Sequence, residues 1–406
     1  MILFLKGTLD TLNLFIDEMM REKLPASENG LPEPMEILDF RDSTALADKL
    51  IALDPLIDET TDVVTFNNAG IQLAIGKVPY WQSKNVRLYN ILVDHPVYYV
   101  DEITKHYYPG MRVICIDKGH VDFLKEILSP IRESFFFLPH GGAAPENPGG
   151  EKDPSALSER EDGIVPGFGA REIDVLYIGS IRGKESPVFP ELPFPDMQDF
   201  YGFCTDYYEK EPYAESGYAV NAYEAYRGIR LLPEQKYILV RNLMVGIESR
   251  IKRKRRIRLI ESLADNGIPV RVFGDGDWKE TADARPGRII YGGMIPAAEC
   301  LKLISKTKIL LNDHPFFADG AHERIFNGML RGAVVATNRS RYLEERFASG
   351  QEILYYDPEK EEDFAHTVGQ LLDDEEELGR IAGQALRKAE NDTWGSRLKE
   401  ILQKHC

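Results

Sequence analysis

Cysteine is scarce in this sequence: Cys115, Cys204, Cys300 and Cys406 are the only four among 406 residues. They are scattered and none forms a CxxC pair, which argues against both a disulfide framework and a structural zinc site. Such cysteine usage fits a reducing compartment, so we expect a cytoplasmic protein.

Long apolar runs are also missing. The first run, at residues 1–5, is shorter than the hydrophobic core of about 7–15 residues in a signal peptide. No run approaches the roughly 18 apolar residues that a membrane span requires. We therefore interpret the N-terminus as the first strand of a sheet.

Positively charged residues are fewer than negatively charged ones. The sequence has 49 Lys and Arg and 66 Asp and Glu, which gives a net charge of −17. A nucleic-acid binder needs a basic face, so we expect no nucleic-acid partner. The hydrophobic content of 43% is ordinary for a globular protein, and the length favours two domains over one core.

Strand and helix patterns alternate through the first half of the chain. Strands are predicted at 2–5, 35–40, 62–66, 86–93, 111–116 and 134–138, with helices at 12–20 and 45–53. Short apolar strands separated by helices indicate a parallel sheet covered on both faces. No G-x-G-x-x-G follows the first strand, so the sequence lacks the usual NAD fingerprint.

The composition changes at residues 141–171, which are rich in Gly, Pro and charge and offer little to bury. We predict a domain at 1–142, a linker or long loop at 143–171, a second domain at 172–380, and a helical tail at 381–406. Within the second domain, residues 182–233 are aromatic, acidic and mainly helical in pattern. This insertion is either an extra packed subdomain or a surface for acceptor binding or homo-oligomerisation.

The second half centres on residues 311–338. A short apolar strand ends at Asn312, a loop with Gly320 follows, and apolar residues then recur at helical spacing, namely Ile325, Phe326, Met329 and Leu330. His322, Glu323 and Arg324 are thus expected at the positive end of a helix, beyond the carboxyl edge of a parallel sheet. Open α/β sheets bind ligands at this edge, and anions favour this end of a helix.

The same stretch resembles the donor-sugar segment of GT-B glycosyltransferases. The resemblance lies in DGAHERIF at 319–326, RGA at 331–333 and YLEERF at 342–347, and it is strongest to the CgeB-like, spore-maturation branch. It implies an α/β fold of two Rossmann-like, doubly wound domains with a cleft between them. It also implies a nucleotide-sugar donor, expected to carry UDP, and catalysis without a cofactor or metal.

Three loops with glycine follow predicted strands of the second domain: Gly179-Ser180, Gly274-Asp275 and the loop that leads to Met294-Ile295. Glycine lets a ligand approach the backbone closely, although strand-to-helix turns use it in any case. The resemblance implies that the second and third of these loops border the nucleobase.

A basic run at residues 250–258 stands out in this acidic chain. It is either a solvated helix face, a contact for an anionic membrane surface, or the source of a cation for the diphosphate. The resemblance places such a cation near the start of this helix, at Lys254, with Arg250 and Arg255 as neighbours. A departing nucleoside diphosphate carries extra negative charge that a cation there would stabilise.

The sequence departs from the family pattern where many retaining GT-B enzymes carry two glutamates. Asp319 and Asn327 occupy those positions, and Asn327 lacks the charge that strengthens a hydrogen bond to a ribose. Glu323 is a substitute for the missing carboxylate, Asp319 and His322 are candidates for contacts to the sugar, and Arg324 is a second candidate for the phosphates.

In the first domain, Asp94-His95-Pro96 ends a predicted strand. It is either a capped turn before proline, or a site at which His95 or Asp94 contacts the sugar or acts as a base on the acceptor. His140 closes another strand and is a comparable candidate.

Three functions remain open from the sequence. The first is a retaining, metal-independent hexosyltransferase that acts on a carbohydrate or protein acceptor. The second is a nucleotide-sugar epimerase on the same fold. The third is a binding module, which the replacement of two glutamates by Asp319 and Asn327 suggests.

Overall fold

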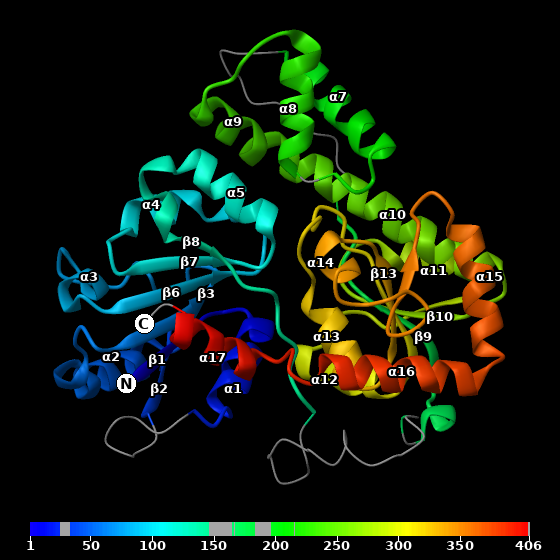
Figure 1. Ribbon diagram of the computed structural model, residues 1–406, viewed down its shortest axis with the longest axis horizontal. Coiled ribbons are helices and arrows are strands. Elements are labelled where there is room, and N and C mark those ends of the chain that lie inside the picture. The colour runs from blue at the N-terminus through cyan, green and yellow to red at the C-terminus, as the bar shows by residue number, and fades with distance from the viewer. Residues whose placement is uncertain (25–32, 146–164, 166, 183–195, 215, 405–406) are drawn as a thin grey trace. The chain divides into compact units, whose positions relative to one another are not determined.

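The chain forms two compact units in the computed structural model, which describes residues 1–24, 33–145, 165, 167–182, 196–214 and 216–404. Unit 1 comprises residues 1–143 and 392–406, and unit 2 comprises residues 144–391. Figure 1 shows a twisted sheet flanked by helices in each unit.

Unit 1 is built on a six-stranded, all-parallel sheet in the order β2-β1-β3-β6-β7-β8. The central strand β3 is buried at every position, as expected for a parallel sheet covered on both faces. The strands are β1 (Ile2–Lys6), β2 (Met35–Asp39), β3 (Asp62–Phe66), β6 (Arg87–Leu92), β7 (Met111–Cys115) and β8 (Phe135–Phe137).

Helices connect these strands, and aspartates cap two of them. The side chain of Asp42 accepts from backbone N–H groups at the start of α2, and that of Asp117 does so for α5. The helices are α1 (Asp10–Met20), α2 (Ser43–Leu53), α3 (Tyr80–Lys84), α4 (Val100–His106) and α5 (Lys118–Ile127), with short 3₁₀ turns at Asp54–Leu56, Pro96–Tyr98 and Ser129–Ser134.

The last helix of the chain, α17 (Trp394–Lys404), packs on α1 and belongs to unit 1. Trp394 is fully buried, and its ring centroid lies 5.2 Å from that of Phe15, 5.0 Å from that of Phe66 and 4.9 Å from that of His140. The end of the chain therefore completes the aromatic core of the domain formed by its beginning.

Unit 2 contains a second six-stranded parallel sheet, in the order β11-β10-β9-β12-β13-β14. Numbered along the chain this order is 3-2-1-4-5-6, the order of a Rossmann sheet. The strands are β9 (Ile173–Ile178), β10 (Val270–Phe273), β11 (Ile289–Tyr291), β12 (Thr307–Asn312), β13 (Val334–Asn338) and β14 (Leu354–Tyr356).

The helices of unit 2 cover both faces of this sheet and share its core with the strands. Trp278 packs edge-on against Tyr177 with ring centroids 5.5 Å apart, between helix and strand. These helices are α10 (Val245–Asp265), α11 (Trp278–Asp283), α12 (Ala297–Ser305), α13 (Glu323–Leu330), α14 (Arg341–Glu344), α15 (Glu361–Leu372) and α16 (Glu375–Ala389), with a 3₁₀ turn at Phe168–Ala170.

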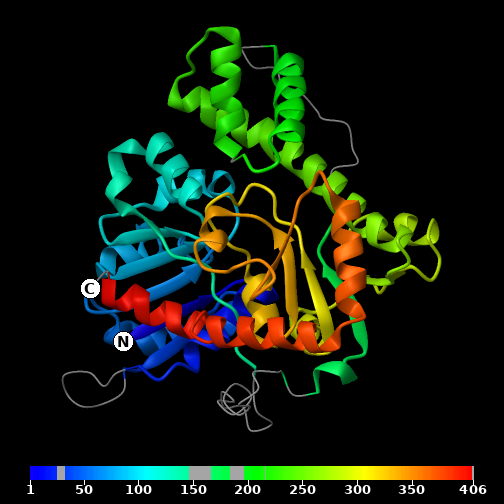
Figure 2. The ribbon, with the colours of Figure 1, turned by 45° about the vertical axis from the view of Figure 1, so that its right-hand side comes forward.

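A helical insertion follows β9 and stands at one end of the long helix α10 (Figure 2). It comprises α7 (Met197–Lys210), α8 (Ser216–Arg227) and α9 (Pro233–Leu239), and a π-helical turn at Val240–Met244 joins α9 to α10. The insertion thus runs past the predicted end at residue 233. The sequence places the linker at 143–171, most of which lies outside the described residues.

Two features differ from the sequence-based expectation. The expected tail at 381–406 is divided, because α16 packs in unit 2 whereas α17 packs in unit 1. A two-stranded hairpin, β4 (Ala74–Ile75) and β5 (Val78–Pro79), is present where no element was predicted, since strands of two residues leave no readable period. No helix in the described part of the chain is long and apolar enough to span a bilayer.

Replacing Trp394 with alanine should destabilise unit 1 by about 3–5 kcal/mol, because a large buried side chain is lost and a cavity remains between α1 and the sheet. Urea unfolding followed by circular dichroism measures the change. The control is Ile51→Ala, also in unit 1 but 74% exposed, which should change stability very little. Equal midpoints for the two variants would show that α17 contributes nothing to this core.

Candidate functional site

The strand order of unit 2 reverses between β9 and β12, and ligands of doubly wound sheets bind outside the carboxyl ends of the strands at such a point. Gly179 and Ser180 follow β9 at this edge, and Asp313 and His314 follow β12. The same edge receives the loop that leads to the start of α13. We therefore take the ends of β9 and β12 and the start of α13 as the candidate site.

A buried carboxylate organises this edge. Asp313 is fully buried, and its Oδ1 accepts from Arg255 Nη2 at 2.9 Å and from the hydroxyl of Tyr356 in a short hydrogen bond. Burial is the main reason why the pKa of Tyr356 lies well above its ordinary value, so the phenol keeps the proton that it donates. One carboxylate thus joins α10, β12 and β14.

Arg256 clamps the two strand ends that flank the reversal. Its Nη1 donates to the carbonyl oxygen of Ser180 at 2.6 Å, and its Nη2 donates to the carbonyl oxygen of Asp313 at 3.1 Å. On the other side, Trp278 Nε1 donates to the carbonyl oxygen of Gly179 at 2.7 Å. The backbone beside the candidate site is therefore fixed by side chains from α10 and α11.

The His-Glu-Arg turn lies at the start of α13. His322 is the N-cap residue, and its Nδ1 is 3.3 Å from the backbone nitrogen of Arg324 and 2.7 Å from Glu323 Oε2. The side chains of His322 and Glu323 are each only 15% exposed. The turn is thus largely sheltered, and its own imidazole already satisfies one backbone N–H of the first helical turn.

Arg324 is aimed back at the sheet by a polar partner on β12. Its Nη1 donates to Asn312 Oδ1 at 2.9 Å, and the Asn312 amide nitrogen in turn donates to Thr337 Oγ1 on β13 at 2.9 Å. Its Nη2 is 3.4 Å from His322 Nε2. A guanidinium has five N–H donors, so this arrangement orients Arg324 while leaving donors for an anion.

The glycines of the strand-end loops are explained by packing of the chain itself. A Cβ on Gly274 would lie 2.3 Å from the carbonyl oxygen of Gly179, and one on Gly276 would lie 1.8 Å from that of Ile181. Backbone therefore meets backbone between the loops after β9 and β10, and no ligand is needed to account for these two residues. Gly293, with φ of +80°, has open space at its Cβ position.

Other predicted site residues of these loops lie at or near the surface. Asp275 Oδ2 accepts from Arg182 Nη2 at 2.9 Å on the surface. Met294 is 73% exposed, and its neighbour Ile295 is half-buried. The structure thus leaves the loop after β11 as an open, partly apolar surface beside the strand ends.

The two residues that replace the family's glutamates are both buried. Asp319 is 3% exposed, and its Oδ2 accepts from Arg341 Nη1 at 2.9 Å, so its charge is already paired at the start of α14. Asn327 is 6% exposed on α13, next to Gly328, which packs directly on β12 and β13. Of the acidic candidates on this stretch, Glu323 is the least enclosed.

Most cations of the basic run at 250–258 form ion pairs within unit 2, and a membrane contact through this run stays a prediction. Lys254 Nζ lies 2.8 Å from Glu209 on the insertion, while Arg255 is shared between Asp313 and the carbonyl oxygen of Pro212. Both line a pocket of about 250 Å³ between α7, α10 and the residues before α15. The further ion pairs of the run are Lys252–Glu248, Arg253–Asp277 and Arg258–Glu361.

In unit 1, Asp94 and His95 follow β6 but have different surroundings. Asp94 is exposed, and its Oδ2 accepts from Asn67 Nδ2 at 2.8 Å and from the hydroxyl of Tyr99 at 2.9 Å. Burial raises the pKa of Tyr99 well above its ordinary value, so this hydroxyl remains a donor. His95 is buried and stacks edge-on against His120, with ring centroids 4.7 Å apart.

These contacts separate the two candidates of unit 1. Asp94 is an oriented carboxylate within reach of solvent, whereas His95 is a packed cap whose Nδ1 accepts from the backbone nitrogen of Val97. His140 is likewise buried, against Trp394 and Phe15. Of the three, Asp94 is the exposed side chain, and a contact of any of them with a ligand stays a prediction.

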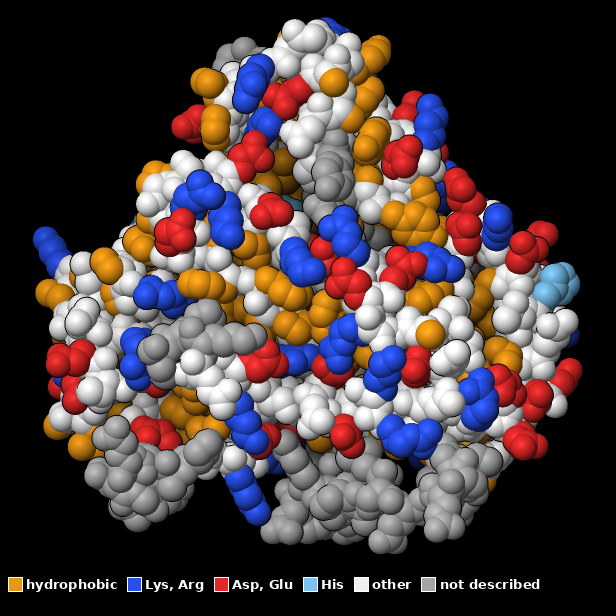
Figure 3. All heavy atoms as spheres, viewed as in Figure 1, with side chains coloured by type: hydrophobic (Ala, Val, Ile, Leu, Met, Phe, Trp, Pro, Cys, Tyr) orange, Lys and Arg blue, Asp and Glu red, His pale blue; other side chains and the backbone are white. Residues whose placement is uncertain are grey.

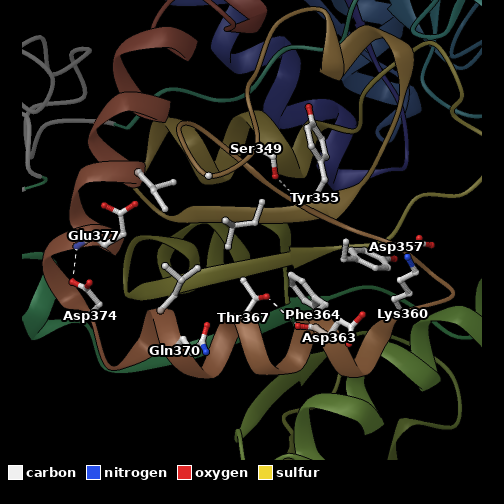
Figure 4. A pocket seen from close by; sticks show the side chains of 15 residues that line it. Ser349, Tyr355, Asp357, Lys360, Asp363, Phe364, Thr367, Gln370, Asp374 and Glu377 are labelled. Atoms are coloured by element: carbon white, nitrogen blue, oxygen red, sulfur yellow. Dashed lines mark hydrogen bonds between the residues drawn. The ribbon is translucent and has the colours of Figure 1, made fainter.

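A second pocket of unit 2, of about 540 Å³, runs along the outer edge of β14 between α15 and α16 (Figure 4). Polar side chains line it along one face of α15, including Asp363, Thr367 and Gln370, and Glu377 lies at its far end. None of the residues that the sequence singles out for the site lines it. It meets the Asp313 cluster through Tyr356, which lines the pocket.

Sequence reasoning missed the residues that hold the site together, above all Asp313, Arg256 and Asn312. Asp313 and Asn312 stand directly after an apolar run, a position at which parallel strands present ligand-binding residues, so their placement was readable. The choice of Arg256 over its basic neighbours was not readable, because it depends on which face of α10 meets the strand ends.

Comparisons with known proteins agree with this architecture. Residues 253–403 match the model of a family described as glycosyl transferase-like. No curated protein matches the chain by sequence.

Solved structures align with nearly the whole chain. HepE of Anabaena in complex with UDP-glucose is 12% identical, with 99% of this chain and 98% of that chain covered and a TM-score of 0.51. A glycosyltransferase of Rickettsia africae is 11% identical, with coverage of 99% and 96% and a TM-score of 0.51. The OtsA structure is 8% identical, with coverage of 99% and 98% and a TM-score of 0.50. The chain therefore has the GT-B fold.

Replacing Asp313 with asparagine should destabilise unit 2 by about 3–5 kcal/mol, because Arg255 is then a buried cation without a counter-charge. Urea unfolding gives the change in free energy. Asp277→Asn is the matched control, since it breaks an ion pair of the same helix near the surface, with Arg253, and should cost at most about 1 kcal/mol. A smaller loss for Asp313→Asn than for Asp277→Asn would contradict the organising role of Asp313.

His314 should make stability fall in mild acid. Burial, followed by the nearby His322 and cations of α10 and α13, lowers its pKa well below the ordinary value of 6.5. Below about pH 6.5 the imidazole of His314 is therefore protonated in the unfolded chain but not in the folded chain. The stability of the folded state then decreases as pH falls through this range. The melting temperature of His314→Asn should drop less between pH 7.5 and 5.5 than that of the native protein, and an unchanged drop would refute this assignment.

Proposed function

We propose that this protein is a glycosyltransferase that moves a sugar from a nucleotide diphosphate sugar to an acceptor. The observation that carries the proposal is Arg324, aimed at the reversal point of a doubly wound sheet from the first turn of α13. The GT-B fold over the whole chain supports it, as does the glycosyl transferase-like family match. HepE, which shares this fold, was crystallised with UDP-glucose and with UDP and glucose, and we propose UDP as the carrier here.

In this proposal the diphosphate lies over the start of α13. The positive end of the helix dipole and the remaining donors of Arg324 attract it, while Asn312 keeps the guanidinium in place. Negative charge grows on the diphosphate as the bond to the sugar breaks, so a pre-oriented cation lowers the barrier. Arg256 acts indirectly, because it holds the backbone carbonyl groups of Ser180 and Asp313 in place.

The nucleoside is proposed to lie toward the loops after β10 and β11. Gly293 leaves open space there, and Met294 offers an exposed apolar surface to a base. Because Asn327 is buried and uncharged, its contribution to binding a ribose is expected to be small. From the resemblance to retaining GT-B enzymes, we also propose that the reaction retains the anomeric configuration of the sugar and needs no metal ion. The CgeB-like subtype is proposed on the same resemblance.

The sugar is proposed to meet Glu323, with His322 beside it. Glu323 is the partly exposed carboxylate of the turn, whereas the carboxylate of Asp319 is enclosed and paired with Arg341. A carboxylate accepts strong hydrogen bonds from sugar hydroxyls and stabilises a positive charge that develops on the sugar ring. In unit 1, the exposed carboxylate of Asp94 is the candidate for contact with the acceptor.

Replacing Glu323 with glutamine should reduce turnover of the donor by about a hundredfold or more while leaving the melting temperature nearly unchanged, because only the charge is lost. Release of nucleoside diphosphate from a panel of nucleotide sugars, beginning with UDP-glucose, measures the effect. Glu376→Gln is the control, an exposed glutamate at the start of α16 whose loss should leave turnover intact.

The outcomes separate the possible functions. Release of nucleoside diphosphate that depends on Glu323 supports a transferase, while conversion of one nucleotide sugar into another would replace it with an epimerase. Binding without turnover, even with acceptors supplied, would reduce the protein to a binding module. Full activity in Glu323→Gln would remove this residue from the site.

A further inference from the structure

Three aromatic rings form a stacked row on the surface of the helical insertion. The rings of Phe203 and Tyr226 are nearly parallel, with centroids 4.9 Å apart and an interplanar angle of 23°. Phe203 and Tyr207 follow at 6.3 Å and 19°. Tyr226 is 64% exposed. We call these three residues the aromatic ladder, and Figure 3 shows hydrophobic side chains among charged ones on this part of the molecule, at the top of the view.

The ladder is held rigidly by the residues beneath it. Tyr223 is fully buried, and its ring packs edge-on against Phe200 and Phe203 at 5.0 and 5.5 Å. Asp199 accepts from the hydroxyl of Tyr223 at 2.8 Å and from Arg227 at 2.7 Å, which ties α7 to α8. The rings therefore present a fixed surface, and little conformational entropy is lost when something binds to it.

The insertion is joined to the candidate site by two contacts. Tyr208, which follows the ladder residue Tyr207 on α7, packs edge-on against Phe316 in the loop before α13, with centroids 4.8 Å apart. Arg255 donates to the carbonyl oxygen of Pro212 in the insertion and to Asp313 at the end of β12. The insertion also leaves the sheet at the carboxyl end of β9. It thus stands on the edge at which the donor is proposed to bind.

The conformation of Phe316 marks this junction. Its φ is +72°, a region that bulky residues rarely adopt and that must be maintained by the surroundings. Tyr208 covers its ring from the insertion, and Lys252 Nζ lies 5.7 Å from the ring centroid. The loop that leads to the His-Glu-Arg turn is therefore shaped in part by the insertion.

We infer that the aromatic ladder binds the carbohydrate part of the acceptor, an inference that rests on the proposed transferase function. One face of Tyr226 stacks on Phe203, and because this side chain is 64% exposed its outer face is accessible. The face of an aromatic ring is negative and attracts the weakly positive C–H groups on the flat side of a sugar ring. On the same face of α7, Asp206 and Lys210 lie at helical spacing from Phe203 and Tyr207 and can hydrogen-bond sugar hydroxyls. A saccharide chain on the ladder is held beside the donor loop.

Charge disfavours an anionic membrane as the occupant. Asp199 and Glu209 of α7 are paired with Arg227 and Lys254, and Asp206 and Lys210 carry opposite charges. This surface is therefore close to neutral, whereas acidic lipids are recognised by clusters of Lys and Arg. The chain as a whole carries a net charge of −17, which also opposes close approach of a second copy. A neutral saccharide does not meet this penalty.

The test measures saccharide binding and donor turnover separately. Isothermal titration of the full-length protein with cellohexaose, maltohexaose and chitohexaose should show binding of at least one, weakened about tenfold in Tyr226→Ala because one stacking partner is lost. Tyr226→Phe should retain binding. Leu232→Ala is the control, since Leu232 is 61% exposed on the same insertion but outside the ladder. Release of nucleoside diphosphate without acceptor should be the same in all variants.

Several results would overturn the inference. No hexasaccharide binding to the native protein at millimolar concentration would do so, as would equal losses in Tyr226→Ala and Leu232→Ala. Binding to vesicles of phosphatidylcholine and phosphatidylglycerol that depends on Tyr226 would assign the ladder to a membrane, and dissociation of a dimer by Tyr226→Ala would assign it to a second copy. If donor turnover is absent while saccharide binding depends on Tyr226, the ladder stands and the transferase proposal fails.

Discussion

The buried charge of Asp313 is the interaction on which the candidate site depends. It lies at the end of β12, beside the point where the strand order of the second sheet reverses, and it joins Arg255 of α10 to Tyr356 of β14. A buried carboxylate is tolerated only when its partners surround it, so these elements must take fixed positions. Arg256 extends the same constraint to β9 through the carbonyl oxygen of Ser180.

This fixed edge determines where the side chain of Arg324 in the His-Glu-Arg turn is directed. A helix start with a histidine cap and a charged first turn is ordinary in itself, but here Arg324 is drawn toward Asn312 at the end of a strand. The same cluster reaches outward as well, because Arg255 also holds the carbonyl oxygen of Pro212 in the insertion. These contacts connect the sheet edge, the loop before α13 and the helical insertion within unit 2.

Sequence reasoning identified the two sheets, because strands such as β3 are buried along their whole length and are therefore visible in the sequence as apolar runs. It also located the start of α13. The glycines at 274 and 276 permit two loops to touch, and whether a ligand also approaches them stays a prediction. Sequence reasoning assigned the diphosphate cation to Lys254 or Arg255, both of which have protein partners in the structure. Whether either also meets a ligand stays a prediction.

By itself the sequence determined the alternation of strands and helices, the Rossmann-like class and the place of the His-Glu-Arg turn, because the periodicity of buried positions is a local property. Only the tertiary structure decided which Lys and Arg side chains form ion pairs within the protein. Asp313 and Tyr356 are 43 residues apart, and the partner of a buried charge is chosen by the packing of distant elements. Likewise, only the tertiary structure shows that Trp394 packs in the core of unit 1. It contacts Phe15 and Phe66, which come from the first part of the chain.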